Sequence, residues 1–283
     1  GPGRPRAAAG QGLRCPGCQC HAEIAHHGLK WGMRVIALET EKFVSKQGQA
    51  LVASMFYEYR LNELGKEFAA RNLAPVIVKG QAIVDLAFPK DEVRLSSDID
   101  LLVGDDAEPI ATALTEIGYE EDTPHSRHFR FGERGFHQHE KRLPGYVEVH
   151  RCLDKIFLRP IPYAEILARA KPSGRSGFRY PTMEDLLLLV VLHASADIFF
   201  DLERVQRDLR FLIGHGKPDM DLVWLRAHQW ELSRALRRLL SGRHPRKAPT
   251  PGRWLTSKTG SYLIGQLLWH DSPLTVLRGL AKY

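Results

Sequence analysis

Three carboxylates in this sequence stand where neighbouring β-strands would bring them together. Asp98 and Asp100 flank Ile99 at the start of an apolar stretch, and Glu148 lies between two valines farther along the chain. Because side chains alternate across a strand, Asp98 and Asp100 face one side of the strand and Ile99 faces the other. The same alternation places Glu148 and His150 on one face of their own strand.

Carboxylates held this close repel one another unless a cation lies between them. At about 5 Å and an effective dielectric constant of about 20, each pair repels by roughly 3 kcal/mol. A divalent cation with a preference for oxygen removes this penalty, which favours Mg²⁺ or Mn²⁺. We therefore predict that Asp98, Asp100 and Glu148 bind such an ion. Two alternatives stay open: a strand-end capping role for the two aspartates, and a salt bridge from Glu148 to Arg94.

A glycine directly after an apolar strand offers a place for phosphate. Residues 73–78 predict a strand, and Lys79-Gly80 connect it to a predicted helix over 81–88. Gly80 permits a tight turn whose backbone N–H groups can meet phosphate oxygens, and Lys79 could add a point charge. Followed by Arg94 and the two aspartates, this pattern fits metal-assisted phosphoryl-group chemistry. The P-loop and protein-kinase signatures are absent from the sequence.

The pattern of apolar residues predicts an α+β fold. The predicted fold consists of an N-terminal helix, a small mixed-sheet core and a C-terminal all-helical half. Apolar residues spaced three and four apart indicate the helices, and apolar residues at every second position indicate the strands. The expected helices cover residues 35–71, 81–88, 107–117, 184–199, 201–213, 219–230 and 233–240, with Thr182 as the N-cap of the fourth. The expected strands cover 73–78, 98–103, 128–131 and 143–150, with a hairpin turn at 133–135.

The composition fits a globular protein of one large domain or two modest ones. The chain has 283 residues, of which 43% are hydrophobic and 26% charged. No apolar run approaches the roughly 18 residues that span a bilayer, and no secretory signal pattern is present, so we expect a cytoplasmic protein without membrane contact. The net charge of +7 suits a polyanionic partner or a triphosphate substrate, but it does not establish nucleic-acid binding.

Residues 1–32 differ from the rest of the chain in composition. Gly, Pro, Ala and Arg dominate the start, and we expect a natural start at Met33 after a disordered leader or a segment derived from the expression vector. A catalytic domain would then cover residues 33–158, and a helical domain residues 159–283. Cys15, Cys18 and Cys20 have the spacing of half a zinc site, and an unstructured tail is the alternative interpretation.

Together these motifs resemble the polymerase-β-like nucleotidyltransferase superfamily. Within it they are most similar to the branch of bacterial uncharacterised nucleotidyltransferase family proteins, and the resemblance covers about residues 73–240. One departure from the superfamily pattern is clear: its usual Gly-Ser before the helix is Lys79-Gly80 here, so a serine hydroxyl that commonly touches phosphate is missing. The resemblance rests on Lys79-Gly80, Arg94, residues 98–103 and residues 147–150.

The resemblance implies an enzyme that moves NMP from an NTP, ATP among them, to an acceptor and releases pyrophosphate. One Mg²⁺ would hold the triphosphate and a second would lower the pKa of an acceptor hydroxyl near Glu148. The implied acceptors are small molecules, peptides or proteins, and tRNA, with no obligate protein partner. The alternative is a non-catalytic nucleotide- or RNA-binding module that retains the fold. By resemblance, the catalytic metal ligands are Asp98, Asp100 and Glu148, and the nucleotide contacts are Lys79, Gly80 and Arg94.

Overall fold

The computed structural model describes residues 46–89, 92, 94, 96, 98–122, 133–138, 145–154, 159–196, 201–242, 269–272, 274 and 276. The chain divides into two compact units, Gly1–Gln49 and Ala50–Tyr283. Of the first unit only the beginning of helix α2 is described, so the fold and the site below belong to the second unit. The predicted leader and its cysteine motif lie outside the described residues.

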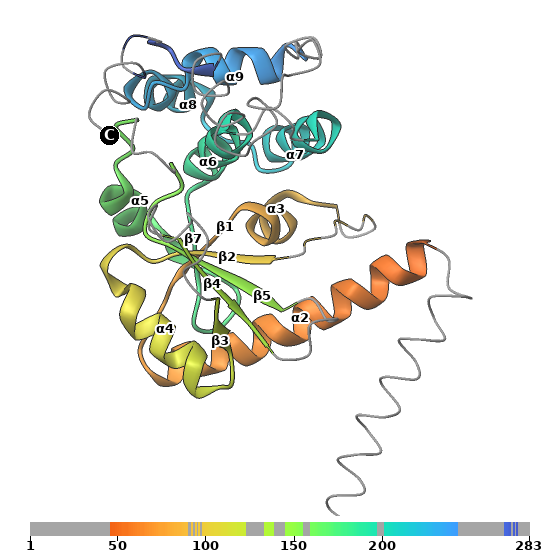
Figure 1. Ribbon diagram of the computed structural model, residues 1–283. Helices are drawn as coiled ribbons and strands as arrows, with labels where there is room; N and C mark the ends of the chain where they lie inside the picture. The colour runs from red at the N-terminus through yellow and green to blue at the C-terminus, as the bar shows by residue number, and fades with distance from the viewer. Residues whose placement is uncertain are drawn as a thin grey trace, which may run out of the picture. The chain divides into compact units, whose positions relative to one another are not determined.

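A mixed sheet forms the centre of the second unit (Figure 1). In the described part of the chain it has seven strands in the order β3-β4-β5-β2-β1-β7-β6. Strand β2 pairs in parallel with β5 and antiparallel with β1, and β1 pairs in parallel with β7. The strands are β1 Val76–Val78, β2 Asp98–Leu102, β3 Glu120–Glu121, β4 Glu133–His137, β5 Tyr146–His150, β6 Lys171–Pro172 and β7 Arg179–Tyr180.

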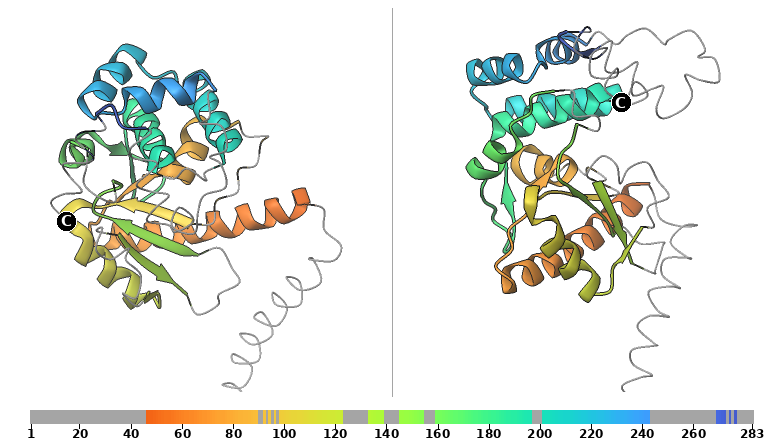
Figure 2. Two further views of the ribbon diagram at one scale, coloured as in Figure 1. Left: turned by 45° about the horizontal axis from the view of Figure 1, so that its top comes forward. Right: turned by 60° about the vertical axis from the view of Figure 1, so that its left-hand side comes forward.

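Helices border this sheet and form a separate group beyond α3. Both α6 and α7 contact α3, which in turn contacts β1 and β2, and Figures 1 and 2 show α6 to α9 gathered together on the side of α3 away from the sheet. No helix among the described residues is long and apolar enough to cross a membrane. The helices are α2 Lys46–Ala70, α3 Lys79–Ala87, η1 Gly104–Asp106, α4 Ala107–Glu116, α5 Tyr163–Arg169, α6 Met183–Ala196, α7 Leu202–Gly214, α8 Met220–Gln229 and α9 Ser233–Leu240.

Local sequence explains where three of these helices begin. The Thr182 hydroxyl accepts a hydrogen bond from the backbone N–H of Asp185 at the start of α6, as its position in the sequence predicts. The carboxylates of Asp201 and Asp219 accept equivalent bonds at the starts of α7 and α8. Such caps satisfy donors that have no partner inside the helix and stabilise it by about 1 kcal/mol each. The apolar run of α6, from Leu186 to Leu192, is buried throughout.

The predicted α+β class is confirmed, but the predicted hairpin turn is wrong, and the predicted strand before it is not tested. Residues 133–135, predicted as a hairpin turn, lie in strand β4, and residues 128–131 fall outside the described residues. Gly135 marks a close approach rather than a turn, because a methyl group there would lie 2.0 Å from the Tyr146 hydroxyl oxygen on β5. That hydroxyl passes across the glycine to donate a hydrogen bond to Asp122.

The sheet also extends into the stretch that was predicted to be all-helical. Strands β6 and β7 come from residues 171–180, and β7 pairs with β1 at Val76 and Arg179. The Arg179 side chain adds hydrogen bonds to the carbonyls of Ala74 and Leu167. Strand β1 would otherwise expose an unpaired edge, and β7 covers it. The division into a catalytic domain ending at residue 158 and a helical domain after it stays a prediction, and the sheet continues beyond that position.

One buried carboxylate fixes α6 to its neighbours. Asp185 is fully buried and receives Arg169 from α5 at 2.5 and 3.0 Å and Arg226 from α8 at 2.9 Å. Its two oxygens therefore join three helices. Glu165 contacts the same Arg169 at 3.2 Å but is 72% exposed.

We expect Asp185→Asn to lower the free energy of unfolding by about 3 kcal/mol, because it leaves two arginines facing a neutral group. Urea denaturation followed by circular dichroism measures this change. The matched control is Glu165→Gln, which removes an exposed partner of Arg169 and should cost less than about 1 kcal/mol. Equal losses in the two variants would show that the buried ion pairs do not carry this stability.

Candidate active site

The parallel pairing of β2 and β5 brings two of the predicted carboxylates side by side. Asp100 is in register with Glu148, and the side chains that alternate with them, Ile99, Val147 and Val149, are buried in the core. The apolar residues thus fix the rotation of each strand and leave the acidic ones on the opposite face. Asp100 is itself only 3% exposed, whereas Glu148 is partly exposed.

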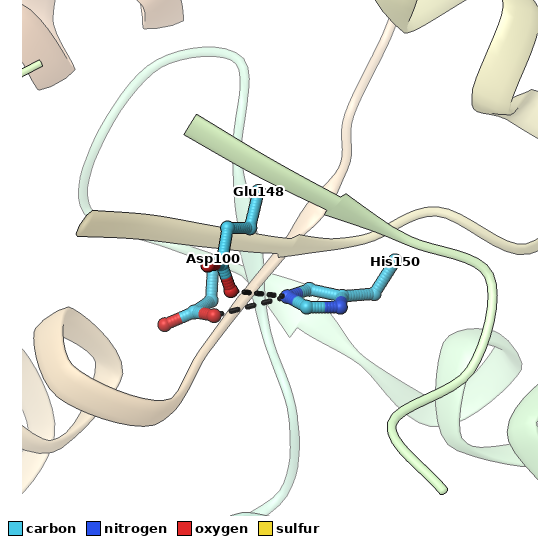
Figure 3. Close-up of side chains that lie close together, drawn as sticks. All are labelled: Asp100, Glu148 and His150. Carbon is cyan, nitrogen blue, oxygen red and sulfur yellow. Dashed lines mark hydrogen bonds and ion pairs between the residues drawn. The ribbon is translucent and has the colours of Figure 1, made fainter. Parts of the chain in front are cut away.

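A histidine completes this pair. Nε2 of His150 lies 3.0 Å from Oδ1 of Asp100 and 3.3 Å from Oε2 of Glu148, as Figure 3 shows. Among the described residues, Asp100, Glu148 and His150 form a group that could hold a metal ion, with ligand atoms all within 4.8 Å of one another. Carboxylate oxygen and imidazole nitrogen together suit a divalent ion such as Mn²⁺ or Mg²⁺.

The ammonium of Lys79 lies against the same carboxylates. Nζ is 2.6 Å from Oδ1 of Asp100 and 3.6 Å from Oε2 of Glu148, and the side chain is 15% exposed. Lys79 also has a left-handed backbone with φ of 55°, a conformation that favours glycine and costs other residues about 1–2 kcal/mol. Lys79 was predicted to contact phosphate, but its ammonium lies against the carboxylates of Asp100 and Glu148.

Burial and ion pairing compete in setting the protonation of this group. Burial alone would raise the pKa of Asp100, but the Lys79 charge and the hydrogen bond from His150 outweigh it, and this pKa is well below its usual value. Burial and Lys79 both lower the pKa of His150, yet its bonds to Asp100 and Glu148 leave it raised. For Lys79, burial lowers the pKa, and the two carboxylates raise it above the usual lysine value. The resting site thus contains an ionised aspartate and a charged lysine.

Asp98 lies two residues before Asp100 on the same face of β2, opposite Tyr146 of β5. It is partly buried and is not one of the three residues whose ligand atoms converge. Its backbone carbonyl accepts hydrogen bonds from the Tyr57 hydroxyl of α2 and, at 3.2 Å, from the Ser96 hydroxyl. These bonds fix the start of β2, which is the end of the strand nearest Gly80 and Ser96.

Arg94 forms its ion pair with Asp208 of α7 rather than with Glu148. Its Nε and Nη2 donate to the two carboxylate oxygens at 3.0 and 2.8 Å, and both side chains are buried. The salt bridge to Glu148 that the sequence left open is therefore replaced by a partner more than a hundred residues away. This bidentate geometry orients the guanidinium, so the position of its third nitrogen is fixed as well.

The third guanidinium nitrogen of Arg94, Nη1, lies beside Gly80 in the first turn of α3. Arg94 Nη1 is buried and has no hydrogen-bond partner among the described residues. A methyl group at Gly80 would lie 2.7 Å from Nη1 and 2.5 Å from the Ser96 hydroxyl oxygen. The N-cap of α3 is Val78, which provides no side-chain hydrogen bond. Nη1 of Arg94 and the Ser96 hydroxyl thus lie against Gly80 in the first turn of α3, and the first turn of a helix is where backbone N–H groups can bind an anion.

Comparison with known proteins identifies the family of this chain. The sequence matches the family described as "Uncharacterised nucleotidyltransferase" over residues 24–242. The chain belongs to this nucleotidyltransferase family. No curated protein matches it. Among solved structures, the polyadenylate synthase of Megavirus is similar at 16% identity and a TM-score of 0.39, over 76% of this chain and 40% of that one.

Nucleotidyltransferases generally employ divalent metals, so we tested whether the residues of this chain fit such an ion. The residues present fit such an ion, because two carboxylates and an imidazole converge within 4.8 Å. The Lys79 ammonium on Asp100 shows in addition that this group attracts a cation. The candidate site therefore has possible metal ligands on β2 and β5 next to the start of α3.

Sequence reasoning did not assign three residues of the site. His150 alternates with Glu148, so its position on the same face is visible in the sequence, but nothing there indicates that it reaches Asp100. Asp208 lies far along the chain from Arg94, and its partner depends on how α7 packs. Ser96 lies close to Gly80 in space although the sequence around Gly80 lacks a serine. Strand alternation was the only available signal, and it applied to His150.

We expect Gly80→Ala to lower the free energy of unfolding by about 1–3 kcal/mol, because the added methyl would overlap Arg94 and Ser96. Urea denaturation of the purified protein measures the loss. Gly174→Ala is the matched control, since nothing lies within 4 Å of its added methyl, and it should be neutral or stabilise by up to about 1 kcal/mol. A Gly80→Ala protein as stable as the control would contradict the close approach at Gly80.

Proposed function

We propose that this nucleotidyltransferase moves NMP from an NTP to an acceptor hydroxyl in a reaction that depends on Mg²⁺ or Mn²⁺. One observation carries the proposal: the Asp100–Glu148 pair lies next to a helix start without a side-chain cap, at which a buried N–H of Arg94 has no hydrogen-bond partner within the described part of the chain. A triphosphate needs both features, since its oxygens require N–H donors and a divalent ion. The family match supports nucleotidyl transfer in general.

The phosphates of the nucleotide bind at Gly80 in this proposal. The backbone N–H groups that open α3 and Nη1 of Arg94 donate to phosphate oxygens, and the absence of a side chain at Gly80 lets the phosphate approach. The Ser96 hydroxyl lies adjacent to Gly80, and its single proton, which the Asp98 carbonyl accepts here, turns to the phosphate when the nucleotide binds. The Asp208 carboxylate holds the arginine in place without contacting the substrate.

Asp98, Asp100 and Glu148 are the proposed metal ligands. When bound, the ion neutralises charge on the phosphates and orients the α-phosphorus for attack. The oxygen of the acceptor hydroxyl forms a bond to the α-phosphorus, and the bond from that phosphorus to the bridging oxygen of pyrophosphate breaks. Glu148, the more exposed of the converging carboxylates, accepts the hydroxyl proton.

The proposal covers several classes of nucleotide and acceptor. The net charge of +7 fits a triphosphate and accommodates an acidic acceptor such as RNA, alongside hydroxyls of peptides or small molecules. ATP is included among the nucleotides, and a cytoplasmic location, where NTPs and Mg²⁺ are abundant, is part of the proposal. Glu148 and Asp100 do not distinguish between these acceptors, because they act on the hydroxyl alone.

A second candidate function is nucleotide or RNA binding without catalysis. The observation that favours it is the Lys79 ammonium, which already neutralises part of the acidic group. In that case the anion site at Gly80 would bind a nucleotide whose phosphates stay intact. The same transfer assay separates the two functions.

We expect the protein to transfer label from [α-³²P]NTPs to a component of cell extract in the presence of Mg²⁺. Asp98→Asn and Asp100→Asn should each lower the rate at least about 100-fold, because they remove metal ligands, and chelation by EDTA should abolish transfer. Asp105→Asn is the matched control, since Asp105 follows β2 and is fully exposed. Labelling that persists unchanged in the Asp98 and Asp100 variants would establish that these residues do not catalyse the reaction.

Ser96→Ala should raise the KM for the NTP about 5-fold with little change in kcat, because it removes one hydrogen bond, of about 1 kcal/mol, to the bound phosphates. Steady-state kinetics with varied NTP measures this effect. The control is Ser241→Ala, whose hydroxyl donates to the Arg238 carbonyl in an exposed turn after α9. An unchanged KM in Ser96→Ala would remove Ser96 from the phosphate site.

A further inference from the structure

His150 meets both carboxylates of the Asp100–Glu148 pair through one ring nitrogen. Its Nε2 lies 3.0 Å from Oδ1 of Asp100 and 3.3 Å from Oε2 of Glu148, and Figure 3 shows the imidazole pointing at both oxygens. Two ligands at right angles around a divalent ion, each bound at about 2.1 Å, lie about 3.0 Å apart. The separations of this nitrogen from the two oxygens therefore match neighbouring positions in the ligand shell of one ion.

A second carboxylate faces the other nitrogen of the same imidazole. Glu133 of β4 is in register with His150 of β5, and its Oε2 lies 3.9 Å from Nδ1. The side chains of His150 and Glu133 are only 2% and 12% exposed, so little water screens this attraction. The Glu133 charge favours a proton on Nδ1, which leaves the lone pair of Nε2 directed at Asp100 and Glu148. Histidines that bind metal ions generally have such a partner at their second nitrogen.

The Lys79 ammonium does not exclude an ion from this position. Oδ1 of Asp100 is approached by Lys79 at 2.6 Å and by His150 at 3.0 Å, and a carboxylate oxygen has lone pairs for two partners. An ion bound to Nε2 takes the place of the hydrogen bond between His150 and Asp100, while the contact of Lys79 is retained. The triphosphate adds its own negative charges, so the ammonium and a divalent ion together are not in excess.

A nitrogen ligand distinguishes between the divalent ions that an acidic site could bind. Mg²⁺ prefers oxygen ligands in strict octahedral geometry and retains several waters. First-row transition metals bind imidazole as well as carboxylate, and Mn²⁺ is the member of that series that best suits carboxylate oxygen. Two carboxylates with one imidazole therefore favour Mn²⁺.

We propose that His150 binds the divalent ion through Nε2, together with Asp100 and Glu148, and that this nitrogen ligand makes the site select Mn²⁺ over Mg²⁺. The inference rests on the proposed function and specifies the ion that it uses. Glu133 is a positioning residue, because it orients the imidazole without contacting the ion.

Electron spin echo envelope modulation of bound Mn²⁺ tests the nitrogen ligand directly. The full-length protein is loaded with Mn²⁺ alone, so that every nitrogen detected belongs to the protein. We expect a ¹⁴N coupling of a bound imidazole in the unsubstituted protein and its loss in His150→Asn and His150→Gln. The matched control is His228→Asn, which changes an exposed histidine of α8 and should retain the coupling.

The affinities for the two ions provide a second readout. Electron paramagnetic resonance of free Mn²⁺ gives the Kd of Mn²⁺, and displacement by Mg²⁺ gives the Kd of Mg²⁺. Mn²⁺ should bind at least about 10-fold more tightly than Mg²⁺, and His150→Asn should lower this ratio by about 10-fold.

Glu133→Gln should weaken Mn²⁺ binding by about 10-fold while the ¹⁴N coupling is retained, because the imidazole loses its orienting charge but stays a ligand. The matched control is Glu120→Gln, which changes a glutamate that lies at the same 3.9 Å from another histidine, His137. This control should leave the Kd of Mn²⁺ unchanged.

The outcomes separate this inference from the proposed function. Bound Mn²⁺ without ¹⁴N coupling in the unsubstituted protein, or coupling that persists in a folded His150 variant, would overturn the role of His150 and leave metal-dependent transfer standing. Where neither His150 variant folds, equal Mn²⁺ affinities of Glu133→Gln and Glu120→Gln would overturn it. A protein that binds neither ion would contradict the metal dependence of the proposed function as well, and coupling in a protein that transfers no label would overturn the proposed function alone.

Discussion

The constraint on which this structure depends is the burial of acidic side chains next to one another on parallel strands. Asp100 and Glu148 are in register, and Asp100 is almost fully buried, so positive charge has to be supplied within hydrogen-bonding distance. Lys79 supplies it from the point where β1 ends and α3 begins. The left-handed backbone of Lys79, at the first residue of α3, goes with the position of that ammonium against the carboxylates.

The same principle of enclosed, paired charge connects the sheet to the helices around it. Arg94 joins the segment before β2 to α7 through Asp208, and Arg175 joins α2 to α3 through Glu58 and Asp85 at 2.6 and 2.8 Å. Each arginine uses more than one nitrogen, which restricts orientation as well as distance. Helices α2 and α7 thereby help to fix the position of α3 and of Arg94 beside Gly80, although neither helix contributes a carboxylate to the Asp100–Glu148 pair.

Sequence reasoning succeeded where local periodicity carried the information. Alternation of apolar and acidic residues in the two strands predicted that Asp100 and Glu148 would share a face, and the motifs predicted the family. It failed where the decisive contact was made across the fold. Gly135 looked like a turn residue because its neighbour in space, Tyr146, is not its neighbour in sequence. The direction of Lys79 and the partner of Arg94 depend on packing between distant elements, and the roles of Asp98, Gly80 and Arg94 in substrate binding stay predictions.

The pairing of β7 with β1 has a consequence for the modularity of this enzyme. Residues from both sides of position 158 form one sheet, and the guanidinium beside Gly80 depends on a carboxylate of α7. A fragment cut after β5 would expose the edge of β1 and leave Arg94 without its anionic partner. The strands that bear Asp100 and Glu148 and the helical part therefore depend on one another, and recombination that exchanged only one of them would break both contacts.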